Sequence, residues 1–328
     1  MLLPALAIAA GFAALFVGAD RLVAGASGLA RNLRVSSLLI GLTIVSIGTS
    51  MPEFFVSSVA ALRGESNLAV GNAIGSNIAN IGMVLGATAL VRALTVQAKL
   101  LWREMTVMLG ALLFTWWLLF DAALSTVDGA LLLLGLLAFT VWTVRTGMRE
   151  GEGDGDGGGG GATCTTPRAL LFILIGLALL SIGSESLVWG AVMVARHFGT
   201  SELIIGLTVI AIGTSLPEAA ACIAGAVKGE GDIAMGNIIG SNIFNMFGVI
   251  GITGVLGASP AAVDSAALAR DMPVMVAMTL AMFFFAILGL RTSRVGAATA
   301  TRGIGAGAGG VLLGAYVCYL AFLVYTAV

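Results

Sequence analysis

Residues 41–86 read GLTIVSIGTSMPEFFVSSVAALRGESNLAVGNAIGSNIANIGMVLG, and residues 206–251 read GLTVIAIGTSLPEAAACIAGAVKGEGDIAMGNIIGSNIFNMFGVIG. The two segments align without a gap at an offset of 165 residues, and about half of their positions are identical. A repeat of this length means that one structural unit occurs twice in the chain. We therefore expect two related halves, residues 1–150 and 167–328, each built around one copy.

The composition is that of a chain embedded in lipid. Of 328 residues, 59% are apolar and 10% are charged, and the mean hydropathy is +1.05. Soluble domains carry about a quarter charged residues, so most of this surface cannot face water. The net charge of −1, with charges scattered between apolar runs, excludes a nucleic-acid interface. Three cysteines at long spacings suggest neither a disulfide framework nor a zinc site.

Apolar runs between charged or Gly/Pro breaks predict an all-α integral membrane protein with ten transmembrane helices, five in each half. These helices are expected near residues 3–30, 36–62, 67–91, 100–120, 126–147, 168–195, 202–227, 233–257, 265–289 and 305–327. An odd number of spans per repeat makes the second half enter the membrane from the opposite side, so the halves are predicted to be inverted copies. Residues 151–166, glycine-rich with three acidic side chains, predict a flexible linker.

Basic residues are distributed unevenly between the two sides of the predicted bundle. One side carries Arg31, Arg34, Arg92, Lys99, Arg103, Arg145, Arg149, Arg168, Lys228, Arg291, Arg294 and Arg302, and the other carries Arg63, Arg196 and Arg270. Because loops rich in Lys and Arg stay in the cytoplasm, the first side and the linker are predicted to be cytoplasmic. Both termini would then face outward, in a multi-pass protein of the cell (inner) membrane.

Each repeat places a glutamate, Glu53 or Glu218, in the middle of an apolar segment. A charged residue at that depth costs about 2.5 kcal/mol or more, so a partner must compensate it. A structural carboxylate, protonated or paired with a base, is one interpretation, but no Lys, Arg or His lies at comparable depth. A cation taken from solution is the more economical partner.

Prolines just before the glutamates predict how a cation is held. Pro52 and Pro217 have no N–H, so the carbonyls of Gly48 and Gly213 lose their helical partners. Freed carbonyls are tolerated at membrane depth only where they line a cavity or bind something. Hydroxyl groups of the same turns complete a shell made only of oxygen, as hard cations such as calcium or sodium require; they belong to Thr49, Ser50, Thr214 and Ser215.

The next helix of each half adds polar groups at helical spacing. Asn72, Ser76 and Asn80 share one helix face, and Asn237, Ser241 and Asn245 repeat them. These groups, with the adjacent Gly-x-x-x-Gly motifs at 71–75 and 236–240, are also typical of helix packing. We favour packing for the glycines. Beside the paired glutamates, we favour ligand or supporting roles for four polar residues: Ser76, Asn80, Ser241 and Asn245.

Two carboxylates supply a charge of −2, which one divalent or two monovalent cations neutralise. Competition between calcium and sodium for one oxygen-lined site is the simplest basis for exchange. Since the two motifs are inverted copies that meet near the midplane, each half can form one wall of a gate, and rocking between two arrangements gives alternating access.

The doubled G-T-S-x-P-E and G-N-x-I-G-S-N-I-x-N motifs resemble the two alpha repeats of the sodium/calcium exchanger family, within the calcium/cation antiporter superfamily. The resemblance covers both repeats and agrees with ten helices. It implies a small prokaryotic antiporter that expels calcium in exchange for sodium and uses no cofactor. The large cytoplasmic calcium-sensing domain of animal exchangers has no room in this chain.

The resemblance also implies roles for individual residues. Glu53 and Glu218 resemble the central calcium ligands, to which Thr49 and Thr214 add backbone carbonyls. The residues that resemble sodium ligands are Ser50, Ser215, Ser76 and Ser241, with the carbonyls of Ser46 and Ala211. Asn80 and Asn245 match the polar pair of a middle site. Some archaeal members have an aspartate at the position of Asn245, so this chain lacks a third carboxylate there.

Two other functions are compatible with parts of the sequence. Proton/calcium exchange or potassium-dependent sodium/calcium exchange would use the same fold, because a desolvated glutamate can titrate. An intramembrane hydrolase using Ser50 or Ser215 would need a general base, and the only histidine, His197, lies in a predicted loop. We therefore do not expect an enzyme.

Two further acids, Asp20 and Glu185, occupy matching positions in the first helix of each half. An ion pair with Arg21 is expected for Asp20, and Glu185 is a candidate for lining an ion pathway.

Overall fold

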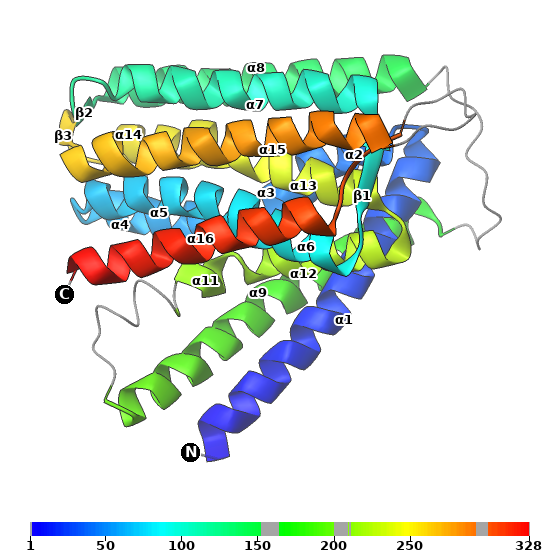
Figure 1. The fold of residues 1–328 in the computed structure, drawn as a ribbon, viewed down its shortest axis with the longest axis horizontal. Coiled ribbons are helices and arrows are strands. Elements are labelled where there is room, and N and C mark those ends of the chain that lie inside the picture. Colours follow the sequence, from blue (N-terminus) through cyan, green and yellow to red (C-terminus); the bar gives the residue numbers. More distant parts are fainter. Residues whose placement is uncertain (1, 152–163, 200–208, 210, 293–300, 328) are drawn as a thin grey trace.

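A computed structural model describes residues 2–151, 164–199, 209, 211–292 and 301–327 of the chain. The described residues are mainly helical (Figure 1). Two parts of the predicted architecture lie outside them: most of the linker, residues 152–163, and the start of the span predicted at 202–227, residues 202–208 and 210. Arg294, assigned to the cytoplasmic side, also lies outside.

The helices of the first half agree with the predicted spans to within a few residues at most ends. They are α1 (Leu2–Leu33), α2 (Ser37–Ile40), η1 (Gly41–Val45), α3 (Ser46–Thr49), α4 (Met51–Leu62), α5 (Ser66–Ala79), η2 (Asn80–Leu85), α6 (Gly86–Val91), α7 (Ala98–Leu118) and α8 (Thr126–Gly151). Two predicted single helices are thus interrupted. The span near 36–62 breaks at Ser50, and the span near 67–91 contains a π-helical turn.

The described part of the second half repeats this order. It contains α9 (Thr166–His197), α11 (Ala211–Thr214), α12 (Leu216–Lys228), α13 (Gly231–Phe244), η4 (Asn245–Val249), α14 (Ile250–Leu256), η5 (Ala267–Asp271), α15 (Met272–Thr292) and α16 (Ala306–Ala327). The break at Ser215 and the π-helical turn at Asn245 recur at the offset of 165 residues.

Among the described residues, seven helical segments are long and apolar enough to cross a membrane. The number is eight if the bent pair Ser37–Thr49 and Met51–Leu62 counts as one span. Helix α7 is not among them; it carries Lys99, Arg103 and Glu104. The protein is therefore an all-helical, multi-pass membrane protein, and the number of ten helices stays a prediction.

Short strand pairs, which the sequence patterns did not indicate, mark two opposite ends of the bundle (Figure 1). Strand β1 (Leu94–Gln97) pairs antiparallel with β4 (Thr301–Ile304), and β2 (Ala123–Leu124) pairs antiparallel with β3 (Ala261–Ala262). The two chain ends both lie toward the β2–β3 end in this view. Connections that are far apart in the sequence are thereby tied together at each end of the bundle.

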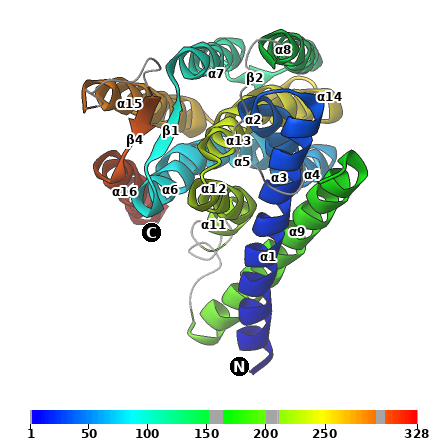
Figure 2. The ribbon, with the colours of Figure 1, turned by 90° about the vertical axis from the view of Figure 1, so that its right-hand side faces the viewer.

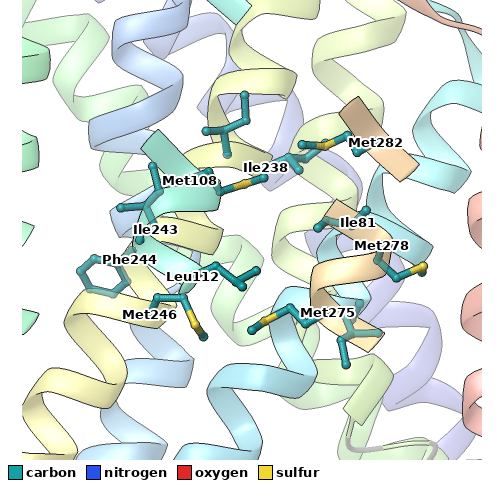
Figure 3. Packing of buried hydrophobic residues seen from close by; sticks show 14 of the residues in the cluster. Ile81, Met108, Leu112, Ile238, Ile243, Phe244, Met246, Met275, Met278 and Met282 are labelled. Carbon is teal, nitrogen blue, oxygen red and sulfur yellow. The ribbon is translucent and has the colours of Figure 1, made fainter. Parts of the chain in front are cut away.

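Helices α5 and α13 form the centre of the bundle (Figure 2). The spans that contain them are 72% and 89% buried, against 17–33% for the other single-helix spans. Methionines of α7 and α15 pack around this centre, among them Met108, Met275 and Met282, beside Ile238 and Ile81 (Figure 3). Methionine is flexible and polarizable, so it fills irregular gaps between crossing helices. This packing separates one side of α5 and α13 from lipid.

Helices α1 and α9 lie side by side on the opposite side of this centre, at a slant to the other helices (Figures 1 and 2). Glycines recur every seven residues along both contact faces, at Gly11, Gly18 and Gly25 and at Gly176, Gly183 and Gly190. A Cβ atom at Gly176 would lie 2.6 Å from the backbone nitrogen of Leu22. Only glycine permits such an approach of two backbones, so α1 and α9 form one tightly packed pair.

Asp20 of α1 is ion-paired, but not with the adjacent Arg21. Its Oδ1 atom lies 2.6 Å from Nζ of Lys228, at the end of α12. Arg21 instead lies over the ring of Phe172 on α9, 5.2 Å from the ring centroid. The expectation was wrong about the partner because helix packing brings a distant lysine closer than the neighbouring arginine. Glu185 is exposed, and its role in an ion pathway stays a prediction.

Candidate ion-binding site

The prolines break both repeat helices where the sequence predicts it. Ser50, between α3 and α4, has φ −88° and ψ 7°, and Ser215, between α11 and α12, has φ −89° and ψ 5°. The axes of the segments on the two sides of Ser50 differ by 45°. As a result, Glu53 and Glu218 stand in the first turns of new helices. Unpaired N–H groups at a helix N-terminus favour a negative charge.

The two glutamates lie buried in the interior of the protein. Both are only 1% exposed. Ser50 of the first repeat donates its hydroxyl to Oε1 of Glu218 in the second, at 2.9 Å. The polar turn that precedes Glu53 therefore contacts the acid of the other repeat, whereas a shared cation site stays a prediction.

Several predicted site residues carry a buried oxygen atom without a hydrogen-bond partner. Among the described residues these atoms are Oε2 of Glu53, Oε2 of Glu218, Oδ1 of Asn80, Oδ1 of Asn245 and Oγ of Ser215. A buried polar atom without a partner costs about 1–3 kcal/mol, so this group is unfavourable unless something binds it. Carboxylate, amide and hydroxyl oxygens are ligands of hard cations. Among the described residues, no group of three or more His, Cys, Asp or Glu side chains could hold a metal ion.

The broken helix of the first repeat packs its polar turn directly against α13. Thr49 donates its hydroxyl to Oδ1 of Asn237 at 3.1 Å, and the hydroxyl of Ser241 lies 3.5 Å from the carbonyl oxygen of Ser46. Ser46, Thr49 and Ser241 are all buried. The structure therefore brings these three predicted site residues together.

An amide in each repeat, to which the sequence assigned no function, anchors this arrangement. Asn237 donates to Sγ of Cys222 at 3.3 Å, and its repeat counterpart Asn72 donates to Oγ of Ser57 at 3.0 Å. Both contacts tie the helix that carries a glutamate to the following helix. Aligning the two repeats matches Ser57 with Cys222, a signal that was available in the sequence but is weak without the contact.

Not every predicted group is placed alike in the two repeats. The freed carbonyl of Gly213 accepts a hydrogen bond from Oγ of Ser184 on α9 at 2.6 Å. Ala19 stands at the repeat position of Ser184 and has no hydroxyl. Thr214 is partly exposed, whereas Thr49 is buried. The predicted ligand Ala211 begins α11.

Close backbone approach is observed at the glycine motif of the second repeat. A Cβ atom at Gly236 would lie 2.6 Å from the carbonyl oxygen of Leu38, and one at Gly240 would lie 2.5 Å from that of Leu42, which confirms the predicted close approach. Nothing described lies within 4 Å of a Cβ atom at Gly71 or Gly75. The prediction stays untested there, because positions 203 and 207, which match Leu38 and Leu42 in the repeat, lie outside the described residues.

A π-helical turn in each repeat begins at one of the two predicted asparagines. η2 begins at Asn80 and η4 begins at Asn245, and both side chains are buried. Single π-helical turns within α-helices are frequently found at functional sites. The predicted polar pair therefore has a distinct backbone geometry that hydrophobic periodicity did not reveal.

Comparison with known protein families matches residues 3–145 and 168–325 to the model described as "Sodium/calcium exchanger protein". The chain belongs to the sodium/calcium exchanger family. It is 40% identical to the inner membrane protein YrbG of Escherichia coli, over 98% of this chain and 97% of that protein. It is 30% identical to the sodium/calcium exchanger MaX1 of Methanosarcina acetivorans, over 87% of this chain and 91% of that protein.

A solved structure of a family member has the same fold. The sodium/calcium exchanger of Methanococcus jannaschii superposes with a TM-score of 0.80 at 30% identity, covering 98% of each chain. Family membership thus agrees with the resemblance of the doubled motifs, and the family is one of exchangers.

Proposed function

We propose that this exchanger-family protein moves calcium out of the cell in exchange for sodium, with Glu53 and Glu218 as the central ligands. The observation that carries the proposal is the burial of these two carboxylates, one from each repeat, with Ser50 of the first repeat bound to Glu218 of the second. Unpartnered buried oxygens of Asn80, Asn245 and Ser215 support it. Two carboxylates neutralise one calcium ion or two sodium ions, so both ions can compete for one place. Competition of this kind couples the two fluxes.

The remaining ligand roles are part of this proposal. Thr49 and Thr214 contribute backbone carbonyls to calcium, and Asn80 and Asn245 contribute amide oxygens to a middle site. Sodium ligands are drawn from the hydroxyls of Ser50, Ser215, Ser76 and Ser241 and from the carbonyls of Ser46 and Ala211. Several of these groups already contact one another across the repeats, which supports a single connected site.

Ten transmembrane helices in two inverted repeats are the architecture that this function requires. The recurrence of the helix break and of the π-helical turn at one offset supports it. Arg31, Arg92 and Lys228 gather at the end of the bundle that also holds β1 and β4, which supports a cytoplasmic location of that end. The linker would then be cytoplasmic, and both termini would face outward.

Flux into proteoliposomes tests the proposal. Vesicles loaded with sodium and diluted into sodium-free buffer should take up radioactive calcium, and a sodium ionophore should abolish the uptake. Uptake that follows a pH gradient and ignores sodium would replace this function with proton/calcium exchange. A strict requirement for potassium on the calcium side would indicate potassium-dependent exchange.

Asn245→Asp is expected to change the dependence on sodium more than the apparent affinity for calcium. A third carboxylate adds negative charge at the middle site, where the sodium-loaded state needs a compensating ligand. A change of about tenfold in half-saturating sodium corresponds to about 1.4 kcal/mol. Initial rates measured against sodium and against calcium would test this, and equal shifts for both ions would argue against a separate middle site.

A further inference from the structure

Asn77 lies at the crossing of the two repeats and contacts both α13 and η4. Its Nδ2 atom donates to the backbone carbonyl oxygen of Asn242 at 3.1 Å. Its Oδ1 atom accepts from Nδ2 of Asn245 at 3.0 Å. All three residues are buried, at 1–2% exposure. Asn77 carries no ligand role in the proposed function.

The donors and acceptors in this series of hydrogen bonds can be arranged in only one way. A backbone carbonyl oxygen can only accept, so the end of the Asn77 amide that faces Asn242 must be the NH₂ group. The other end of Asn77 is then its oxygen, which also can only accept. The atom of Asn245 that meets it must therefore be Nδ2. One peptide carbonyl thus determines which way round the Asn245 amide lies.

This arrangement determines which atom of the Asn245 amide points away from Asn77. Its Oδ1 atom is buried and has no hydrogen-bond partner among the described residues. With the amide reversed, an NH₂ group would occupy this position and would present partial positive charge to a cation. Orientation of this one amide therefore decides whether the position attracts or repels a cation.

We propose that Asn77 is a positioning residue that holds the Asn245 amide with its oxygen toward the cation site. The proposal rests on the proposed function, since it takes Asn245 as a ligand. It also gives a reason why an asparagine is sufficient here: a fixed amide presents only its oxygen. An aspartate would present an oxygen in either orientation and would need no such partner.

A double-mutant comparison tests the proposal. Asn77→Ala should raise the half-saturating sodium concentration about tenfold, about 1.4 kcal/mol, with the maximal rate of calcium flux changed less than about twofold. The same substitution in an Asn245→Asp background should not raise half-saturating sodium, because a carboxylate needs no orienting and its oxygen would only repel Oδ1 of Asn77. Equal losses in both backgrounds, or no loss in either, would overturn the positioning role.

Two further variants separate orientation from packing. Asn77→Asp keeps an acceptor for Nδ2 of Asn245 but removes the donor to Asn242, so it should retain sodium affinity better than Asn77→Ala; equal impairment would point to a structural role. Asn242→Ala is the matched control, because the Asn242 side chain donates to Ile238 of its own helix at 2.6 Å. It should leave half-saturating sodium within about threefold of the unmodified protein, and a tenfold loss there would count against the proposal.

The outcome for the unmodified protein distinguishes the two levels of the proposal. If it shows no calcium flux driven by sodium, the proposed function fails. The positioning role alone fails under two conditions. The unmodified protein shows sodium-driven calcium flux, and Asn77→Ala changes half-saturating sodium equally whether residue 245 is Asn or Asp.

Discussion

Glu53→Gln and Glu218→Gln should each abolish sodium-driven calcium transport while the protein remains inserted and folded. Glutamine has nearly the shape of glutamate but removes one of the two negative charges of the site. At an effective dielectric constant near 20, a unit charge 4 Å away contributes about 4 kcal/mol, so we expect calcium flux to fall by at least about 100-fold. Calcium uptake into sodium-loaded proteoliposomes, with the amount of folded protein checked by size-exclusion chromatography, measures this.

Glu65→Gln provides the matched control for the loss of a carboxylate. Glu65 is exposed in the turn between α4 and α5, so its replacement should leave the flux within about twofold of the unmodified protein. Normal exchange in both Glu53→Gln and Glu218→Gln would place the cation site elsewhere. Loss of flux in only one of them would mean that the two acids are not equivalent ligands.

Gly176→Leu should separate α1 from α9 and sharply lower the thermal stability of the protein. A Cβ atom there would lie 2.6 Å from the backbone nitrogen of Leu22 and 2.8 Å from the carbonyl oxygen of Gly18. Backbone cannot yield as a flexible side chain can, so the larger leucine should exceed the usual overpacking cost of about 1–3 kcal/mol. The melting temperature in detergent and calcium flux should both fall.

Gly110→Leu makes the same substitution where there is space for it. Gly110 of α7 is exposed, and no described atom lies within 4 Å of its Cβ position. Its replacement should leave the melting temperature unchanged or raise it slightly, because leucine is a better helix former than glycine. If Gly176→Leu were as stable and active as Gly110→Leu, close packing of α1 against α9 would not be needed for the fold.

Local signals in the sequence were sufficient for most of the secondary structure. Long apolar runs predicted the helices because lipid leaves the backbone no partner except itself. The breaks at Ser50 and Ser215 followed from prolines two residues later, since a proline removes one helical donor wherever the chain folds. The π-helical turns at Asn80 and Asn245 were not predicted, because they depend on packing and have no periodic signature.

The candidate site was predictable to the extent that it is repeated. Glu53 and Glu218 could be paired from the repeat alone, because they occupy the same position in two copies of one motif. Contacts that break this symmetry could not be predicted in the same way. Ser184 caps the carbonyl of Gly213, but its counterpart is Ala19, and Asn77 orients Asn245 while Asn242 binds its own helix.

The sequence by itself determined that this protein is a helical membrane protein with a doubled acidic motif, since composition, periodicity and repetition are properties of the chain. Tertiary structure alone decided which partner each polar group has: Lys228 and not Arg21 for Asp20, and Asn77 for Asn245. The physical reason is range. Helix formation depends on residues within one turn of each other. A hydrogen bond between the two repeats depends instead on how two whole helices cross, and side chains far apart in the sequence determine that crossing.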